Sequence, residues 1–214
     1  MTEYSMYKNV IFDIDGTLID TEGTGVHSLI RTVKELMHRE MSYDEAYTYF
    51  GIPSVNVPKL LEYPEPEEFA DLWERYFVEL RHLMKIFPGI SEMMPVLSEA
   101  GCKIGCVTSR TRQEFENDPV VQPLRDYFEV EICAEDSLRH KPDPEPALEY
   151  LKRSGAEASS TIYVGDTIFD CHCAKGAGTE FMLADWADRN PSGFPSHLRA
   201  RNAEEMLKGI LGQP

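Results

Sequence analysis

The side chains that could do chemistry come in four short segments that are far apart in the sequence. They are Asp13-Ile14-Asp15-Gly16-Thr17, Thr108-Ser109, Lys141-Pro142, and Gly165-Asp166 with Asp170 beyond it. If folding brings them together, several carboxylates, a hydroxyl and one ammonium share a site. Crowded carboxylates repel one another and raise each other's pKa values unless a cation is present. Mg2+ takes oxygen ligands and often binds substrate phosphate, so these residues predict a magnesium site that accepts a phosphoryl group.

The charge of the predicted site supports this interpretation. The four carboxylates carry a charge of -4, and Mg2+ together with Lys141 carries +3. These carboxylates are Asp13, Asp15, Asp166 and Asp170. If Asp15 is protonated, the site is close to neutral and can accept a phosphoryl dianion.

The elements that must position these residues alternate between strands and helices. Short apolar runs that predict buried strands lie near residues 8–13, 103–108, 130–133, 161–164 and 180–183. Helical patterns lie near residues 92–99, 114–128 in broken form, 145–154, 168–177 and 203–211. This alternation predicts an α/β fold with a doubly wound parallel sheet. In such sheets ligands bind beyond the carboxyl ends of the strands, where the four segments begin.

One connection is much longer than the others. The first strand ends near residue 13 and the next begins about 90 residues later, whereas a βαβ crossover needs on the order of 30. The extra residues carry helical apolar faces and a capping box from Ser42 to Glu45. We therefore expect a catalytic core of residues 1–20 and 87–214 and a small all-helical cap of residues 21–86. The expected hinges are Thr21 to Gly25 and Phe87 to Gly89.

Composition excludes several classes of protein. The chain has 214 residues, 42% hydrophobic and 27% charged, which is typical of a globular protein. A net charge of -16 repels nucleic acid and anionic lipid, so we expect neither as a partner. No apolar run approaches the length of a membrane span, and the first residues do not resemble a signal peptide. Five cysteines, an odd number, indicate free thiols, and a cytoplasmic location is expected.

The four segments resemble the motifs of the haloacid dehalogenase superfamily, in its phosphoglycolate phosphatase and beta-phosphoglucomutase-like branch. The matching residues are Asp13-x-Asp15-Gly16-Thr17-Leu18, the strand ending in Thr108, Lys141-Pro142-x-Pro144 and Gly165-Asp166-x-x-x-Asp170, in the family order. The resemblance implies a Rossmann-like core with an inserted helical cap. It also implies a Mg2+-dependent phosphatase that hydrolyses a small phosphorylated metabolite.

The resemblance assigns roles to the acidic residues. It implies that Asp13 is the nucleophile, which forms an aspartyl phosphate. Asp15 would be the general acid for the leaving oxygen and then the base that activates water. Mg2+ would be held by the Asp13 carboxylate, the Asp15 backbone carbonyl and Asp166, with Asp170 as a direct or indirect ligand.

The remaining motif residues would bind the phosphoryl group. Thr108 and the Ser109 backbone would hold phosphoryl oxygens, while Lys141 would offset the charge of nucleophile and phosphate. Arg110 and Arg112 are interpreted as solvated surface residues rather than as contacts for an anionic substrate tail.

Alternatives differ from this interpretation at particular features. The residue two positions after Asp13 is acidic, Asp15, which argues against the dehalogenase branch, because that branch has a non-acidic residue there. A phosphosugar mutase would share all the core residues, and only family frequency favours hydrolysis. A receiver-like signalling protein carries its phosphoacceptor on a later strand and has no insertion. An intact acid set argues against a non-catalytic binding relative.

The cap is expected to select the substrate. We expect the turn of residues 49–54 to face the site, because Gly51-Ile52-Pro53 interrupts two helical stretches. This turn contains no Arg or Lys, so a highly charged substrate tail is not supported. The apolar helices of the insertion would permit a homodimer without requiring one.

Overall fold

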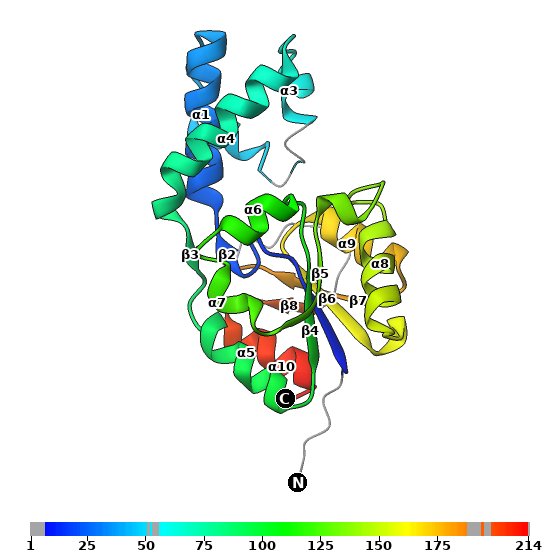
Figure 1. Ribbon diagram of the computed structural model, residues 1–214. Coiled ribbons are helices and arrows are strands. Elements are labelled where there is room, and N and C mark those ends of the chain that lie inside the picture. The colour runs from blue at the N-terminus through cyan, green and yellow to red at the C-terminus, as the bar shows by residue number, and fades with distance from the viewer. Residues whose placement is uncertain (1–6, 51, 53–55, 188–193, 195–197, 214) are drawn as a thin grey trace. The chain divides into compact units, whose positions relative to one another are not determined.

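The computed structural model describes residues 7–50, 52, 56–187, 194 and 198–213. The chain divides into two compact units (Figure 1). The larger comprises Met1–Ile19 and Ile86–Pro214, and the smaller comprises Asp20–Lys85.

The larger unit is built on a six-stranded parallel sheet with the order β5-β4-β1-β6-β7-β8. Its strands are β1 (Asn9–Phe12), β4 (Lys103–Val107), β5 (Phe128–Ile132), β6 (Thr161–Gly165), β7 (Glu180–Ala184) and β8 (Leu198–Ala200). This order is that of a Rossmann-like sheet, which confirms the predicted fold class. The sequence did not predict β8, because three residues with a central arginine carry no strand pattern.

Helices cover both faces of this sheet (Figure 1). They are α5 (Ile90–Glu99), α6 (Arg112–Asn117), α7 (Gln122–Arg125), α8 (Glu145–Ser154), α9 (Ile168–Gly176) and α10 (Ala203–Leu211), with 3-10 turns at Ala134–Asp136 and Ala158–Ser160. Helices α8 and α9 lie on one face, and α5 and α10 lie on the other (Figure 1). None of the helices within the described residues has both the length and the apolar character needed to cross a bilayer.

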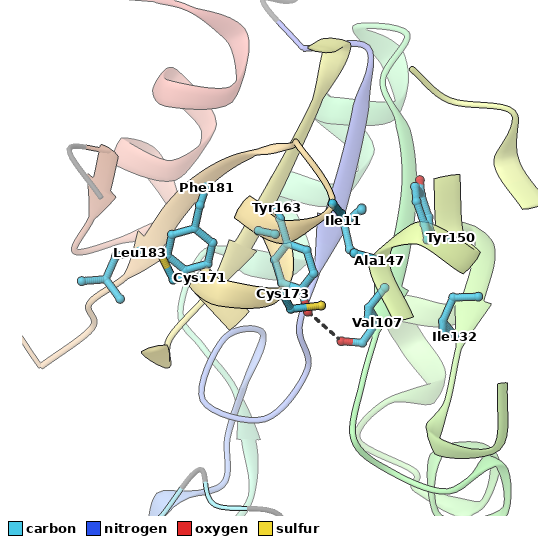
Figure 2. Packing of buried hydrophobic residues seen from close by; sticks show 12 residues of the cluster. Ile11, Val107, Ile132, Ala147, Tyr150, Tyr163, Cys171, Cys173, Phe181 and Leu183 are labelled. Carbon is cyan, nitrogen blue, oxygen red and sulfur yellow. Dashed lines mark hydrogen bonds between the residues drawn. The ribbon is translucent and has the colours of Figure 1, made fainter. Parts of the chain in front are cut away.

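The core of the larger unit explains why β1 is apolar after Asn9. All four residues of β1 are buried, as expected for a central parallel strand covered on both faces. Figure 2 shows one apolar cluster, in which Ile11 of β1 lies among residues of β4, β6, α8 and α9. Within it the Tyr163 hydroxyl donates to the Val107 carbonyl at 3.3 Å. A rigid core therefore supports the ends of the central strands.

The register of the sheet aligns three strand ends. Phe12 of β1 pairs with Cys106 of β4 and with Val164 of β6. The residues that follow these positions therefore leave the sheet side by side. This places Asp13 between the ends of β4 and β6.

The smaller unit is helical, as the sequence pattern predicts. It contains α1 (Glu22–Met37), α2 (Tyr43–Tyr47), α3 (Val57–Leu60), α4 (Pro66–Leu80) and a 3-10 turn at Arg81–Leu83. Helices α1 and α4 share an apolar core that includes Leu29 and Phe69, and Trp73 Nε1 donates to Ser28 Oγ at 2.8 Å. Of the predicted capping box, the Ser42 half is confirmed, since its hydroxyl accepts from the Glu45 amide at 3.1 Å, whereas the Glu45 carboxylate pairs with Arg39.

Two short strands, β2 (Ile19–Asp20) and β3 (Lys85–Ile86), pair with each other where the chain passes between the units. In the predicted hinge of Thr21 to Gly25, both glycines lie inside α1. The Gly25 amide donates to the Thr21 carbonyl at 2.8 Å, and Val26 is buried in the core of its own unit. Because the face of α1 that carries Val26 is buried, the helix continues through Gly23 and Gly25.

Candidate active site

A buried lysine joins two carboxylates at the end of β1. Lys141 Nζ lies 2.6 Å from Asp13 Oδ1 and 2.7 Å from Asp170 Oδ1. It also lies 5.6 Å from the centre of the Tyr163 ring. The peptide bond between Lys141 and Pro142 is cis. Residues from β1, α9 and the loop before α8 thus meet at one edge of the sheet, as their positions in the sequence predict.

Three carboxylates form a cluster that could hold a metal ion. Oxygen atoms of Asp13, Asp166 and Asp170 all lie within 4.8 Å of one another. Asp13 and Asp170 are buried, and Asp166 is half-buried. Carboxylate oxygens at such spacing are the donors that a hard cation such as Mg2+ prefers. The chemistry of the donor set therefore fits a divalent cation.

The electrostatics of the cluster show a shortage of positive charge. Burial raises the pKa of Asp13 to about 7 against the opposing attraction of Lys141, with smaller increases from Asp170 and Asp15. Loss of hydration, followed by repulsion from Asp170 and Asp13, raises the pKa of Asp166 well above its usual value. The pKa of Lys141 is also high, because the attraction of its two carboxylates outweighs its burial. Lys141 therefore remains an ammonium ion, and one such cation does not balance the cluster.

Two glycines allow the backbone to approach the carboxylates closely. A Cβ atom added to Gly16, whose φ is +80°, would lie 2.2 Å from Asp166 Oδ2. One added to Gly165 would lie 2.5 Å from the Cβ of Asp170. The glycines of both predicted motifs thus make room for the carboxylates of Asp166 and Asp170. The Thr17 hydroxyl also donates to Asp166 Oδ1 at 3.3 Å.

Asp170 is held by donors on both of its oxygens. Oδ2 accepts from the Thr167 amide at 3.1 Å and from its hydroxyl at 2.5 Å. The Asp170 amide donates back to the Thr167 hydroxyl at 3.3 Å, which completes a capping box at the start of α9. Oδ1 accepts from Lys141 and lies 3.3 Å from the Tyr163 hydroxyl, which shares its one proton between this oxygen and the Val107 carbonyl. These bonds fix the Asp170 carboxylate where it orients the lysine ammonium.

Asp15 has a different environment from Asp13. Its side chain is 33% exposed and accepts two hydrogen bonds from Arg110, at 2.8 Å from Nε and 2.6 Å from Nη2. Arg110 Nη1 donates to the buried Asp118 at 2.5 Å. The attraction of Asp15 and Asp118 outweighs burial and raises the pKa of Arg110.

The interpretation of Arg110 as a solvated surface residue is therefore wrong. Its side chain is only 9% exposed, because two carboxylates pair with it. Arg112 is 33% exposed but pairs with Glu131 and Asp136, so it is anchored rather than freely solvated. No local pattern indicates the contact of Arg110 with Asp118, which lies between two short helices.

Thr108 and Ser109 follow β4, beside this group. Thr108 is buried, and its hydroxyl accepts from the Arg110 amide at 3.2 Å. Ser109 is exposed, and within the part of the chain that the structure describes it makes no hydrogen bond to the acid cluster. Of the turn predicted to select substrate, residues 51 and 53–54 lie outside the described residues. Tyr49 and Phe50 pack against the core of the helical unit.

Trp186 supports the loop after β1 and was not identified from the sequence. Its indole Nε1 donates to the Thr17 carbonyl at 3.0 Å. Its ring stacks on Phe87, with ring centres 4.4 Å apart. Because Trp186 lies in a loop after β7 with no motif around it, only the folded chain reveals this contact.

Comparisons with known proteins agree with this geometry. Residues 10–184 match the family model described as haloacid dehalogenase-like hydrolase. A Clostridium perfringens protein with the provisional name pyrophosphatase PpaX is 32% identical over 176 residues, which cover 82% of each chain. A phosphoglycolate phosphatase of Aquifex aeolicus is 29% identical over 180 residues, which cover 83% of this chain and 84% of the relative.

A solved structure shows the same fold over nearly the whole chain. It is a Lactobacillus plantarum protein provisionally described as a phosphoglycolate phosphatase, with 25% identity and a TM-score of 0.86. The match covers 94% of this chain and 98% of that protein. The match of residues 10–184 to the family model, together with these relatives, shows that the chain belongs to the haloacid dehalogenase-like hydrolase family.

Proposed function

We propose that this hydrolase is a Mg2+-dependent phosphatase that cleaves small phosphomonoesters through an aspartyl phosphate on Asp13. The observation that carries the proposal is the buried Asp13, paired with Lys141 at the end of β1 beside two further carboxylates. A carboxylate fixed by a lysine can act as a nucleophile toward phosphorus. The names of the relatives, which include phosphatases and pyrophosphatases, support the same class of reaction.

The Asp13 carboxylate, the Asp15 backbone carbonyl and Asp166 would hold the ion. When bound, Mg2+ supplies positive charge that offsets the carboxylates and the phosphoryl oxygens. Asp170 acts indirectly in this proposal, because both of its oxygens already accept hydrogen bonds from the protein. Its part is to orient Lys141.

The reaction then needs two proton transfers. The Asp13 carboxylate attacks phosphorus, and Asp15 gives a proton to the leaving oxygen. Water then attacks the aspartyl phosphate, and Asp15 takes the proton that water loses. Lys141 offsets charge on nucleophile and phosphate, while Thr108 and the Ser109 backbone bind phosphoryl oxygens. Positioning and electrostatics of this kind supply most of the catalysis in phosphoryl transfer.

We further propose that residues 21–86 form a cap over a core of residues 1–20 and 87–214. A cap that excludes water would protect the aspartyl phosphate and contact the leaving group. The net charge of -16 argues against nucleic acid or a membrane surface as the partner. All five cysteines are buried thiols outside any disulfide, which supports a reducing compartment such as the cytoplasm.

A substrate panel tests this proposal. Purified protein is given pyrophosphate, phosphoglycolate and a set of sugar phosphates, with and without Mg2+ and with a sugar bisphosphate activator. We expect inorganic phosphate to be released from at least one phosphomonoester only when Mg2+ is present. Isomerisation of a sugar phosphate faster than phosphate release would show a mutase instead. Release that does not depend on Mg2+ would contradict the proposal.

A further inference from the structure

The carboxylate of Asp15 is held by an arginine that lies outside the acid cluster. Arg110 donates through Nε to one Asp15 oxygen and through Nη2 to the other, at 2.8 Å and 2.6 Å. Such a fork fixes both the position and the plane of a carboxylate. Each carboxylate oxygen keeps a second lone pair, so Asp15 can still accept a proton while it is held.

Arg110 is itself fixed from two directions. Its Nη1 donates to Asp118 Oδ2 at 2.5 Å, and Asp118 Oδ1 accepts from the Val120 amide at 2.9 Å. Its backbone amide donates to the Thr108 hydroxyl, and its carbonyl accepts from the Ala134 amide at 2.8 Å. The arginine is thus anchored to the end of β4 and to the turn after β5.

The charges of the group argue against a subsite for an anionic substrate. Arg110 carries +1, whereas Asp15 and Asp118 together carry -2 when ionised. The guanidinium is already more than neutralised, and its side chain is only 9% exposed. It is therefore better suited to positioning Asp15 than to attracting a negatively charged group.

We propose that Arg110, fixed by Asp118, is a positioning residue that holds Asp15 as the base for the second half of the reaction. This inference rests on the proposed function. In that step water forms a bond to phosphorus, and the bond between phosphorus and the Asp13 oxygen breaks. The proton of water passes to Asp15, and the Asp13 carboxylate is regenerated. The two hydrogen bonds from Arg110 hold the Asp15 carboxylate in one orientation, in which it can accept the proton of water.

The proposal separates the two halves of the reaction. A general base contributes about 10²- to 10⁴-fold, so Arg110→Gln should lower kcat by roughly 10²-fold through slow hydrolysis of the aspartyl phosphate. The first half should be spared for 4-nitrophenyl phosphate, whose good leaving group needs little help from an acid. For this substrate, kcat/KM of Arg110→Gln should therefore fall less than about tenfold, because proton transfer contributes little to the first step.

The test is a stopped-flow measurement of 4-nitrophenol release, with wild type and variants checked for folding by thermal unfolding. For Arg110→Gln we expect a burst of about one nitrophenol per active site followed by slow turnover. Asp118→Asn and Arg110→Lys should show the same burst with a smaller loss of kcat, and they carry the test if Arg110→Gln does not fold. Arg112→Gln is the matched control, because Arg112 pairs with Glu131 and Asp136 and should show no burst.

The outcomes separate this inference from the proposed function. Equal losses of kcat and kcat/KM without a burst, or no loss in any of the folded variants, would overturn the role of Arg110 while leaving the phosphatase intact. A wild-type protein that releases neither nitrophenol nor phosphate from any substrate would contradict the proposed function itself.

Discussion

The Cα of Gly16 lies so close to the carboxylate of Asp166 that a Cβ atom there would be 2.2 Å from Oδ2. The φ of Gly16 is +80°, a conformation that other residues adopt only with strain. A side chain at position 16 would therefore force the carboxylate of Asp166 to move. The position of the Asp166 carboxylate thus depends on the absence of a Cβ atom at residue 16 in the neighbouring loop.

Gly16→Ala should displace Asp166 and weaken Mg2+ binding. We expect the variant to need at least about tenfold more Mg2+ for half-maximal phosphatase activity, since loss of a supporting contact typically costs 10- to 100-fold in metal affinity. A Mg2+ titration of activity measures this. Gly23→Ala is the control, because a Cβ there meets nothing within 4 Å and the residue lies in α1. An unchanged Mg2+ requirement in Gly16→Ala would contradict the placement of Asp166 in the metal site.

Lys141→Met should lower both stability and activity. Without the ammonium, the buried carboxylates of Asp13 and Asp170 lose the cation that lies within 2.7 Å of each. Removing one partner of a buried ion pair costs about 3–5 kcal/mol, which urea unfolding of the metal-free protein can measure. Lys152→Met is the control, since that lysine is 76% exposed and should leave the unfolding midpoint nearly unchanged. Similar midpoints for the two variants would show that Lys141 does not compensate the carboxylates.

The stability of the metal-free protein should fall as pH rises through the acid range. The pKa of Asp13 is about 7 in the folded chain, and an aspartate in an unfolded chain has a pKa of about 3.9. Between these values the folded state binds more protons than the unfolded state, so the free energy of unfolding decreases with increasing pH. The raised pKa of Asp166 acts in the same direction. Mg2+ should therefore raise the melting temperature more at pH 8 than at pH 5.

Asp166→Asn provides the matched control for this experiment. It removes one of the repelling carboxylates, so we expect a higher melting temperature than wild type at pH 8 without metal. The added stabilisation by Mg2+ should largely disappear, together with activity. Equal Mg2+ effects at pH 5 and pH 8 in the wild type would contradict this account of the cluster.

The sequence predicted the parts of the site that depend on strand ends. Asp13 and Asp166 follow apolar runs that form β1 and β6, and Lys141 and Asp170 lie in the loop and helix beside them. Because parallel strands end at one edge of the sheet, residues at those positions meet once the fold is known. Their chemical roles remain predictions.

The contacts that sequence reasoning missed depend on how separate loops meet. Arg110 binds Asp15 across 95 positions of the chain, and no local pattern specifies that pairing. The strand β8 is too short to show alternation, and burial of α1 in the core of its own unit outweighs the helix-breaking tendency of Gly23 and Gly25. In each case tertiary packing decides the outcome rather than local propensity.

Trapping the covalent intermediate tests the central claim most directly. Protein is mixed with Mg2+ and a radiolabelled phosphomonoester found in the substrate panel, then quenched in acid within one turnover. Borohydride reduction and peptide mass spectrometry locate the modified residue, because an aspartyl phosphate is reduced to homoserine. We predict labelled protein, homoserine at position 13, and neither in the Asp13→Asn variant. An absence of label during active turnover, or modification at another residue, would contradict the assignment of Asp13 as the nucleophile.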